Sequence, residues 1–230
     1  MDYMITGEHM AFLEAHGFRK IAFDDMLLCP WEVTGNEFRR LHSLVTVETP
    51  VQIYHFYNIY LLARQAMRAK GVFVECGVFK GGTASFIANV LADRRPFHLF
   101  DTFEGLPALS KNDHVHFEGE FSRTDVDTVI DSVGHRDTVI AHKGLIPDTF
   151  AGFDNSIAFA HVDVDLYQSV KDCCEFLYPR MSVGGIMLFD DYGHFTCPGA
   201  HKAVNEYFAD KNDVPLPLFF GQCVVIKGAE

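Results

Sequence analysis

From Gly71 onward, short apolar runs alternate with segments of helical length, and this alternation constrains the fold more than any other feature of the chain. Such a pattern is typical of an α/β protein, in which helices cover both faces of a parallel sheet. The expected strands are 71–78, 97–101, 138–144, 156–165, 184–191 and two short runs on either side of Gly221. The expected helices are 51–67, 81–93, 124–134, 166–179 and 199–210. We therefore predict a doubly wound, mostly parallel seven-stranded sheet with an antiparallel C-terminal strand at its edge.

The region before residue 51 lacks this alternation. We interpret residues 1–50 as an N-terminal helical cap or dimer arm and residues 51–230 as the main domain, whose length suits one α/β domain. The first residues carry charges and no clean apolar stretch, so neither a signal peptide nor a transit peptide is visible. No apolar run approaches the roughly 20 residues that span a bilayer. We expect a cytoplasmic protein that contacts no membrane.

Composition excludes two further classes of function. The chain has 19 Lys and Arg against 31 Asp and Glu, a formal net charge of −12, and no basic stripe that would bind phosphate backbones. We therefore exclude nucleic acid as a partner. The six cysteines form no CxxC pair and no zinc-like spacing, so we interpret them as reduced thiols of the core.

Four aspartates lie at the expected carboxyl ends of two consecutive buried strands. They are Asp163 and Asp165, in HVDVDLY, and Asp190 and Asp191, in FDDY. Two carboxylates about 4 Å apart repel by roughly 4 kcal/mol at an effective dielectric constant of about 20, so such a cluster requires protons or a cation. A helix N-cap explains Asp165, which precedes an expected helix, but it does not explain the second pair. The sequence thus predicts a hard divalent cation, which takes oxygen ligands and leaves positions for a substrate oxygen.

A glycine-rich turn follows the first expected strand. Residues 75–82 read ExGxxxGG, and glycines there let the backbone approach a ligand closely, beside the free N–H groups of a helix N-terminus. A plain tight turn has the same composition, but Asp101 ends the next strand, where an acid accepts hydrogen bonds from ribose hydroxyls. The spacing differs from the GxGxxG motif that accommodates a pyrophosphate. A nucleoside without phosphates fits better, and we expect S-adenosylmethionine, with its methionine end near Gly77 and its ribose near Asp101.

Six segments between about residue 71 and residue 207 carry a further signal. They are, in order, VECGVFKGG, FDTFEGLP, the KG of HKGLIPDTF, HVDVDLYQSV, LYPRMSVGGIMLFDDY and GAHKAV. Together they resemble the macrocin O-methyltransferase (TylF-like) family, whose members methylate sugar hydroxyls of antibiotics. The resemblance implies the class I methyltransferase (Rossmann-like) fold, S-adenosylmethionine as the cofactor and Mg²⁺ or another divalent cation.

The resemblance also implies roles for individual residues. Asp163, Asp190 and Asp191 occupy the metal-ligand positions, and Asp165 occupies the position of the general base. The residues expected to contact the cofactor are Glu75, Gly77, Gly81, Thr83, Asp101, Thr102, Lys143, Gly144 and Asp163.

Histidines compete with Asp165 for the role of the base. His116 lies in a long polar loop, residues 104–123, and loops of that length in compact domains are usually functional or mobile. A closing lid would bring it over the acceptor, so we retain His116 as a second candidate. The other histidines considered for this role are His114, His161 and His194.

These features predict a metal-dependent O-methyltransferase that transfers a methyl group from S-adenosylmethionine to a hydroxyl of a sugar or other small natural product. The cation lowers the pKa of the attacked hydroxyl, and Asp165 takes its proton. Two alternatives keep the fold: methylation of a catechol-like phenol, and a catalytically silent protein that only binds the cofactor. A nicotinamide dehydrogenase is disfavoured, because GxGxxG is absent. We expect a small-molecule acceptor, a sugar or glycosylated metabolite, and assembly into a homo-oligomer.

Overall fold

A computed structural model describes residues 36–229 of the chain, with the exception of 114, 123 and 136. The chain divides into two units, Met1–Gly35 and Asn36–Glu230, and the described residues all belong to the second. The helical cap or dimer arm predicted for residues 1–50 therefore lies outside the described residues as far as residue 35. The second unit begins with a short helix, α3 (Asn36–His42), and an irregular segment that leads into the next helix.

Seven strands of the described unit form one mixed sheet with the order β3-β2-β1-β4-β5-β7-β6. Their bounds are β1 Val72–Cys76, β2 Phe97–Asp101, β3 Val139–Lys143, β4 Ile157–Val162, β5 Met181–Phe189, β6 Leu216–Pro217 and β7 Cys223–Ile226. The first five strands pair in parallel, whereas β7 is antiparallel to β5 and β6 is antiparallel to β7. The predicted doubly wound, mostly parallel sheet with an antiparallel strand at its C-terminal edge is confirmed.

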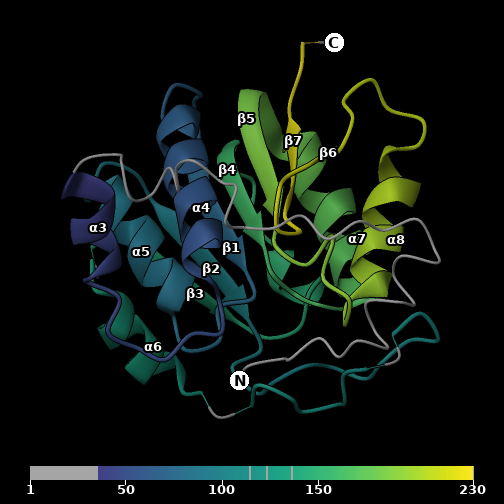
Figure 1. Ribbon diagram of the computed structural model, residues 1–230, viewed down its shortest axis with the longest axis horizontal. Helices are drawn as coiled ribbons and strands as arrows, with labels where there is room; N and C mark the ends of the chain where they lie inside the picture. Colours follow the sequence, from purple (N-terminus) through teal and green to yellow (C-terminus); the bar gives the residue numbers. More distant parts are fainter. Residues whose placement is uncertain (1–35, 114, 123, 136, 230) are drawn as a thin grey trace, which may run out of the picture. The chain divides into compact units, whose positions relative to one another are not determined.

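Helices cover both faces of this sheet (Figure 1). On one side lie α3, α4 (Ile53–Ala66), α5 (Gly82–Leu91) and α6 (Val126–Val133). On the other side, α7 (Tyr167–Leu177) and α8 (Pro198–Phe208) pack against each other. Within the described residues, every helix is too short or too polar to cross a bilayer.

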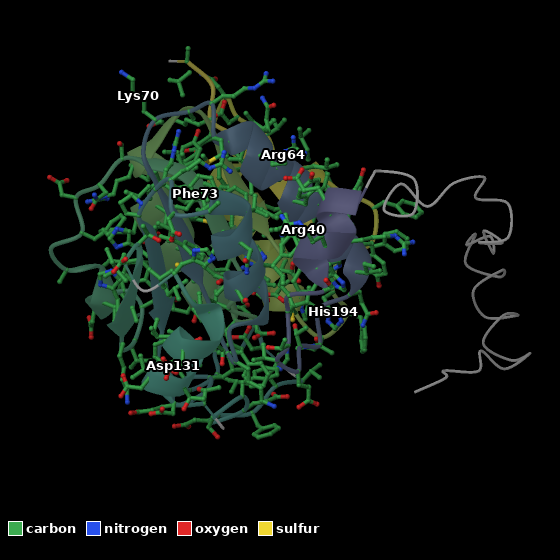
Figure 2. All side chains as sticks on the ribbon, turned by 90° about the vertical axis from the view of Figure 1, so that its left-hand side faces the viewer. Arg40, Arg64, Lys70, Phe73, Asp131 and His194 are labelled. Carbon is green, nitrogen blue, oxygen red and sulfur yellow. The ribbon has the colours of Figure 1, made fainter. Side chains whose placement is uncertain are left out.

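The alternation of side chains along β1 builds a core on each face of the sheet. Successive residues of a strand point to opposite faces. Phe73 packs against Phe159 of β4, with ring centroids 5.2 Å apart, while Val74 and Cys76 belong to the cluster that contains the buried residues of α7 and α8. Figure 2 shows Phe73 in the interior and Arg64, on α4, at the surface. Each fully buried large apolar side chain contributes about 1.5–3 kcal/mol.

The carboxyl ends of the central strands approach one another closely, and this brings the site together. The backbone N–H of Asp163 donates to Cys76 O at 2.9 Å, and that of Asp190 donates to Val162 O at 2.9 Å. Gly77 has a φ of +84°, and a Cβ there would lie 1.7 Å from the carbonyl oxygen of Asp163. Only glycine is compatible with this approach. The turn after β1 and the aspartates after β4 and β5 are thus fixed in one place.

Candidate active site

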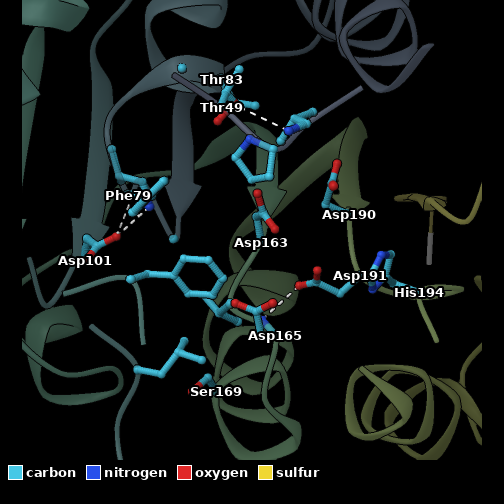
Figure 3. A pocket seen from close by; sticks show the side chains of 18 of the residues that line it. Thr49, Phe79, Thr83, Asp101, Asp163, Asp165, Ser169, Asp190, Asp191 and His194 are labelled. Atoms are coloured by element: carbon cyan, nitrogen blue, oxygen red, sulfur yellow. Dashed lines mark hydrogen bonds between the residues drawn. The ribbon is translucent and has the colours of Figure 1, made fainter. Parts of the chain in front are cut away.

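A pocket of about 350 Å³ opens at the carboxyl ends of β1, β2, β4 and β5 (Figure 3). Ligands of open α/β sheets bind at this edge, and the volume lies in the range of small-molecule sites. Its walls come from the turn after β1, the loop after β2, the ends of β4 and β5, the segment 48–55 and Phe220. The pocket therefore collects residues from nearly the whole described chain.

Most of the predicted cofactor residues line this pocket, and three do not. Those in the lining are Gly77, Thr83, Asp101, Thr102, Gly144 and Asp163. Glu75, Gly81 and Lys143 lie outside it, and each has contacts of its own. Lys143 Nζ pairs with Glu104 Oε1 at 3.0 Å, on the surface. Gly81 begins α5 with a φ of +83°, and a Cβ there would meet Val133 Cγ2 at 3.0 Å, so its role is in helix packing.

Asp101 closes the turn after β1 instead of presenting a free carboxylate. Its Oδ2 accepts the backbone N–H groups of Val78 at 2.6 Å and Phe79 at 3.0 Å. Its Oδ1 accepts the N–H of Phe103 at 2.6 Å. A ribose hydroxyl at this position has to share oxygens that already hold the backbone. The structure therefore gives Asp101 a part in shaping the pocket that the sequence did not indicate.

Asp190 is held by side chains from distant parts of the chain. Its Oδ1 accepts from Gln222 Nε2 at 2.6 Å and from His161 Nε2 at 3.3 Å. Its Oδ2 accepts from His55 Nδ1 at 2.9 Å. Gln222 and His161 are fully buried, and Asp190 is nearly so. This predicted metal ligand is already engaged in a buried network.

The two histidines that bind Asp190 each face a second acceptor. His55 Nε2 lies 3.0 Å from Phe220 O, and His161 Nδ1 lies 2.8 Å from Glu75 Oε1. Donation from both ring nitrogens requires the protonated imidazolium form. Burial by itself lowers the pKa of a histidine. The hydrogen bonds and charge of Asp190, joined at His161 by those of Glu75, outweigh this effect, so the pKa values of His55 and His161 are raised.

The same network keeps Asp190 ionised and gives Glu75 its place. Burial raises the pKa of Asp190, but the hydrogen bonds from His161 and His55 lower it well below its usual range. Glu75 and His161 are paired neighbours on β1 and β4. Glu75 is fully buried, and its Oε2 has no hydrogen-bond partner. Glu75 therefore positions His161, and it is not among the residues that line the pocket.

Asp163 and Asp191 form no ion pair with another residue of the described part of the chain. Within the described part of the chain, no group donates a hydrogen bond to the Asp163 carboxylate. Asp191 Oδ2 accepts the backbone N–H of Asp165 at 2.8 Å. Burial, followed by repulsion from neighbouring aspartates, raises the pKa of both carboxyl groups well above the usual value. A cation bound here removes that penalty.

Asp165 adopts an unusual backbone conformation just before the N-terminus of α7. Its φ is +58°, in the left-handed region that few residues other than glycine adopt. Its N–H bond to Asp191 holds this conformation, and strain of this kind concentrates at functional sites. Burial raises the pKa of Asp165 to about 6, repulsion by Glu120 and Asp190 adds to the shift, and a hydrogen bond from the Cys197 thiol opposes it. Such a carboxylate suits proton transfer near neutral pH.

The loop between β2 and α6 brings His116 to Asp165. His116 Nε2 lies 3.6 Å from Asp165 Oδ1, and Nδ1 lies 2.9 Å from Glu120 Oε2. The loop is fastened by Asp113, whose Oδ1 accepts the backbone N–H of Tyr167 at 2.9 Å at the start of α7. This bond satisfies one of the free N–H groups of that helix. The structure thus places both predicted base candidates side by side.

The remaining histidine candidates differ in position. His161 lies in the buried network and does not face the pocket. His194 lines the pocket but is exposed, with Nδ1 2.6 Å from Thr196 Oγ1. His114 lies outside the described residues.

Four residues that contribute to this site were missed from the sequence. They are His55, Gln222, Glu120 and Cys197. His55 lies in an expected helix and Gln222 at the start of an expected strand. A polar side chain at a position that becomes buried was the only local signal. Their contacts depend on the tertiary fold.

Residues 62–222 match the family model described as Macrocin-O-methyltransferase (TylF). The 8-demethyl-8-(2,3-dimethoxy-alpha-L-rhamnosyl)-tetracenomycin-C 4'-O-methyltransferase of Streptomyces olivaceus is 30% identical over 153 residues, which are 60% of this chain and 58% of that protein. The demethyldecarbamoylnovobiocin O-methyltransferase of Streptomyces niveus is 28% identical over 156 residues, again 60% of this chain and 58% of that protein. The chain thus spans less than two thirds of the length of these two relatives.

A solved structure, that of the O-methyltransferase NovP, has a similar fold, with a TM-score of 0.71 and 24% identity over 80% of this chain and 84% of that chain. The family match extends over well more than half of the sequence and includes the glycine-rich turn and both aspartate motifs. The chain belongs to the macrocin O-methyltransferase (TylF) family.

Proposed function

We propose that this chain is an S-adenosylmethionine-dependent O-methyltransferase that requires a divalent cation and acts on a hydroxyl of a sugar or another small natural product. One observation carries the proposal: Asp163, Asp165 and Asp191 line the same pocket as the glycine-rich turn, and burial raises the pKa of each. Family membership supports the reaction class. The Streptomyces olivaceus relative acts on a rhamnosyl tetracenomycin, which supports a glycosylated acceptor.

The pocket fits the proposed cofactor on the side of the glycine-rich turn. Gly77 carries no side chain over the cavity, and Thr83 lies in the first turn of α5, where backbone N–H groups are free. We propose that Gly77, Thr83, Thr102 and Gly144 contact S-adenosylmethionine. Asp101 holds the turn in the conformation that makes this contact possible.

The acidic side of the pocket fits a hard divalent cation. The donor set is made of carboxylate oxygens, which Mg²⁺ prefers. Asp163 has no hydrogen-bond donor among the described residues, and burial with mutual repulsion raises the pKa values of Asp163 and Asp191. We propose these two as the principal ligands. Asp190 already accepts hydrogen bonds from three side chains, so it contributes only a remaining lone pair.

The residues of this chain orient the acceptor and remove its proton. When bound, S-adenosylmethionine supplies an electrophilic methyl group, and the cation supplies positive charge that favours an ionised acceptor oxygen. Asp165 accepts the proton of the acceptor hydroxyl on its carboxylate. Glu120 holds the Nδ1–H of His116, so in the neutral ring Nε2 is an acceptor and offers a second position for the same proton.

Product analysis by mass spectrometry tests this proposal. The full chain is incubated with S-adenosylmethionine and a panel of glycosylated natural products, free sugars and catechols, with Mg²⁺ or with EDTA. We expect methylated sugar hydroxyls with Mg²⁺ and none with EDTA. Methylation of phenols alone favours the catechol alternative. Cofactor binding without turnover or cation affinity favours a silent binding protein.

Assembly into a homo-oligomer stays a prediction, which analytical ultracentrifugation tests.

A further inference from the structure

A histidine, an aspartate and a cysteine converge beside the pocket from three separate segments. His116 comes from the loop before α6, Asp165 follows β4, and Cys197 is the N-cap residue of α8. Across the described ranges, these are the one set of three His, Cys, Asp or Glu side chains whose ligand-type atoms all lie within 4.8 Å of one another. Among the described residues, no such set is formed by the aspartates discussed above for Mg²⁺, namely Asp163, Asp190 and Asp191.

The three atoms form a nearly equilateral triangle. His116 Nε2 lies 3.4 Å from Cys197 Sγ and 3.6 Å from Asp165 Oδ1, and Sγ lies 3.6 Å from the same Oδ1. In a tetrahedral zinc site, bonds of about 2.3 Å to sulfur and about 2.0 Å to nitrogen and oxygen place neighbouring ligand atoms about 3.3–3.6 Å apart. The triangle therefore has the dimensions of one face of such a tetrahedron.

We propose that His116, Asp165 and Cys197 form a binding site for a divalent ion of the Zn²⁺ class, separate from the carboxylate site for Mg²⁺. Nitrogen, oxygen and sulfur donors suit Zn²⁺ and its neighbours, whereas Mg²⁺ prefers oxygen alone. On binding, the Cys197 S–H bond breaks, its proton passes to solvent and the sulfur–metal bond forms. Cys197 is a free, buried thiol, as the sequence predicts, and the proposal adds a ligand role to it.

The surroundings of the triangle support this assignment. Glu120 Oε2 accepts the Nδ1–H of His116 at 2.9 Å, which leaves the Nε2 lone pair directed at the site, as in many metal-bound histidines. Cys197 is 2% exposed, so an ion there is shielded from bulk water. His116 and Asp165 both line the pocket, which supplies an entry route. The fourth position of a tetrahedral site is left to water, which reaches it through the pocket.

An ion at this site ties the loop before α6 to the start of α8 and engages the Asp165 carboxylate. On the proposed function, in which Asp165 is the base, Zn²⁺ therefore inhibits an enzyme that Mg²⁺ supports. Binding of the ion itself does not depend on that function. The site can accordingly be tested without any turnover.

The test is a titration of the metal-free, reduced full chain with Zn²⁺, in competition with a chromophoric chelator and with excess Mg²⁺ present. We expect one tightly bound ion per chain. Glu120→Gln, which alters the hydrogen-bond partner of a ligand, should weaken the Zn²⁺ affinity by about tenfold. Cys197→Ala and His116→Ala each remove a ligand, so each should weaken it by more than about 100-fold, the upper end of what losing such a partner costs. Cys223→Ala, at another buried thiol, and His135→Ala, at a histidine outside the pocket, are matched controls that retain the affinity.

A second readout needs no substitution and remains available if a variant does not fold. Wild-type chain loaded with Co²⁺ in place of Zn²⁺ should show a sulfur-to-cobalt charge-transfer band in the near ultraviolet, because a thiolate is a ligand. Absence of this band, or a Zn²⁺ affinity that Cys197→Ala leaves unchanged, overturns the proposal. Loss of the affinity in Asp163→Asn instead assigns the ion to the carboxylate site. No methyl donor or acceptor is present, so a negative result leaves the proposed methyl transfer standing.

Discussion

The acidic cluster has two ends that are built from the same residue type but from different surroundings. At the compensated end, Asp190, three side chains donate to one carboxylate, and its pKa is lowered. At the uncompensated end, which comprises Asp163, Asp165 and Asp191, burial and repulsion between carboxylates raise the pKa values, and the contacts there do not offset that shift. The difference shows that aspartates at equivalent strand ends serve different purposes. Compensation stabilises the fold, and its absence leaves carboxylates available to a ligand and a proton.

The largest effect is expected at the uncompensated end, on the rate. Asp165→Asn removes the proton acceptor, and general base catalysis typically contributes about 10²–10⁴-fold, so kcat should fall by that factor. The fold should survive, because burial already disfavours the charged form of this carboxylate. Steady-state kinetics with Mg²⁺ measure the effect. Asp172→Asn, on α7 outside the pocket, is the control, and equal activities of the two variants would remove Asp165 from the mechanism.

The second effect is expected at the compensated end, on stability. Asp190→Asn leaves the imidazolium of His55 without its counter-charge and removes one of the two carboxylates that face His161. Removing one partner of a buried ion pair costs about 3–5 kcal/mol, and we expect the free energy of unfolding to fall by that amount. Urea unfolding of metal-free protein at neutral pH measures it. A loss below about 1 kcal/mol would mean that the network contributes little to folding.

The two ends should also respond to pH with opposite signs. The pKa of Asp165 rises from 3.8 to about 6 on folding, so its contribution to stability is present below 3.8 and is lost as the pH rises through about 6. That loss is on the order of 1–3 kcal/mol. Asp190, whose pKa is lowered, contributes stability above 3.8 that is lost as the pH falls. Unfolding of wild type and Asp165→Asn in EDTA should therefore diverge between about pH 4 and pH 6, with the variant gaining. Parallel curves across this range would contradict the assigned shift.

The smallest effect, again on the free energy of unfolding, tests whether the hydrogen-bond network around Asp190 includes Asn58. Asn58 Nδ2 donates to Gln222 Oε1 at 2.8 Å, and Gln222 in turn donates to Asp190. Asn58→Ala leaves the buried Gln222 oxygen without this donor and should cost about 1 kcal/mol in the free energy of unfolding. Asn205→Ala, which removes an exposed bond to Tyr192, should change it by less than about 0.5 kcal/mol. Thermal denaturation of both variants decides whether Asn58 belongs to the network.

Most of the fold can be predicted from local pattern, and its exceptions have local causes. Strand β2 occupies the expected range, and β4 lies within the apolar run that predicted it. Strand β5 begins at Met181, before the glycine pair at which the pattern predicts its start. Its pairing with β4 shifts register between Met181 and Ile186, where Gly184 adopts a φ of +78°. Strand β6 ends at Pro217, since the residues after it turn toward Gly221. Periodicity predicts burial well and irregular backbone poorly.

The site was predictable only in part, for a similar reason. The aspartates were expected to converge because carboxyl ends of parallel strands meet at one edge of a sheet. The partners of Asp190 could not be found in this way, since His55 is 135 residues away in the sequence and Gln222 is 32. Whether a buried carboxylate is compensated is a property of tertiary contacts, and the sequence shows the acid without its partner.

The most direct test of this account is a calorimetric titration of metal-free protein with Mg²⁺ in the presence of S-adenosylhomocysteine. We predict one bound ion per chain, with binding lost in Asp163→Asn and kept in Asp172→Asn. No binding to the wild type, or equal binding to Asp163→Asn, would contradict the claim that the uncompensated carboxylates hold the cation.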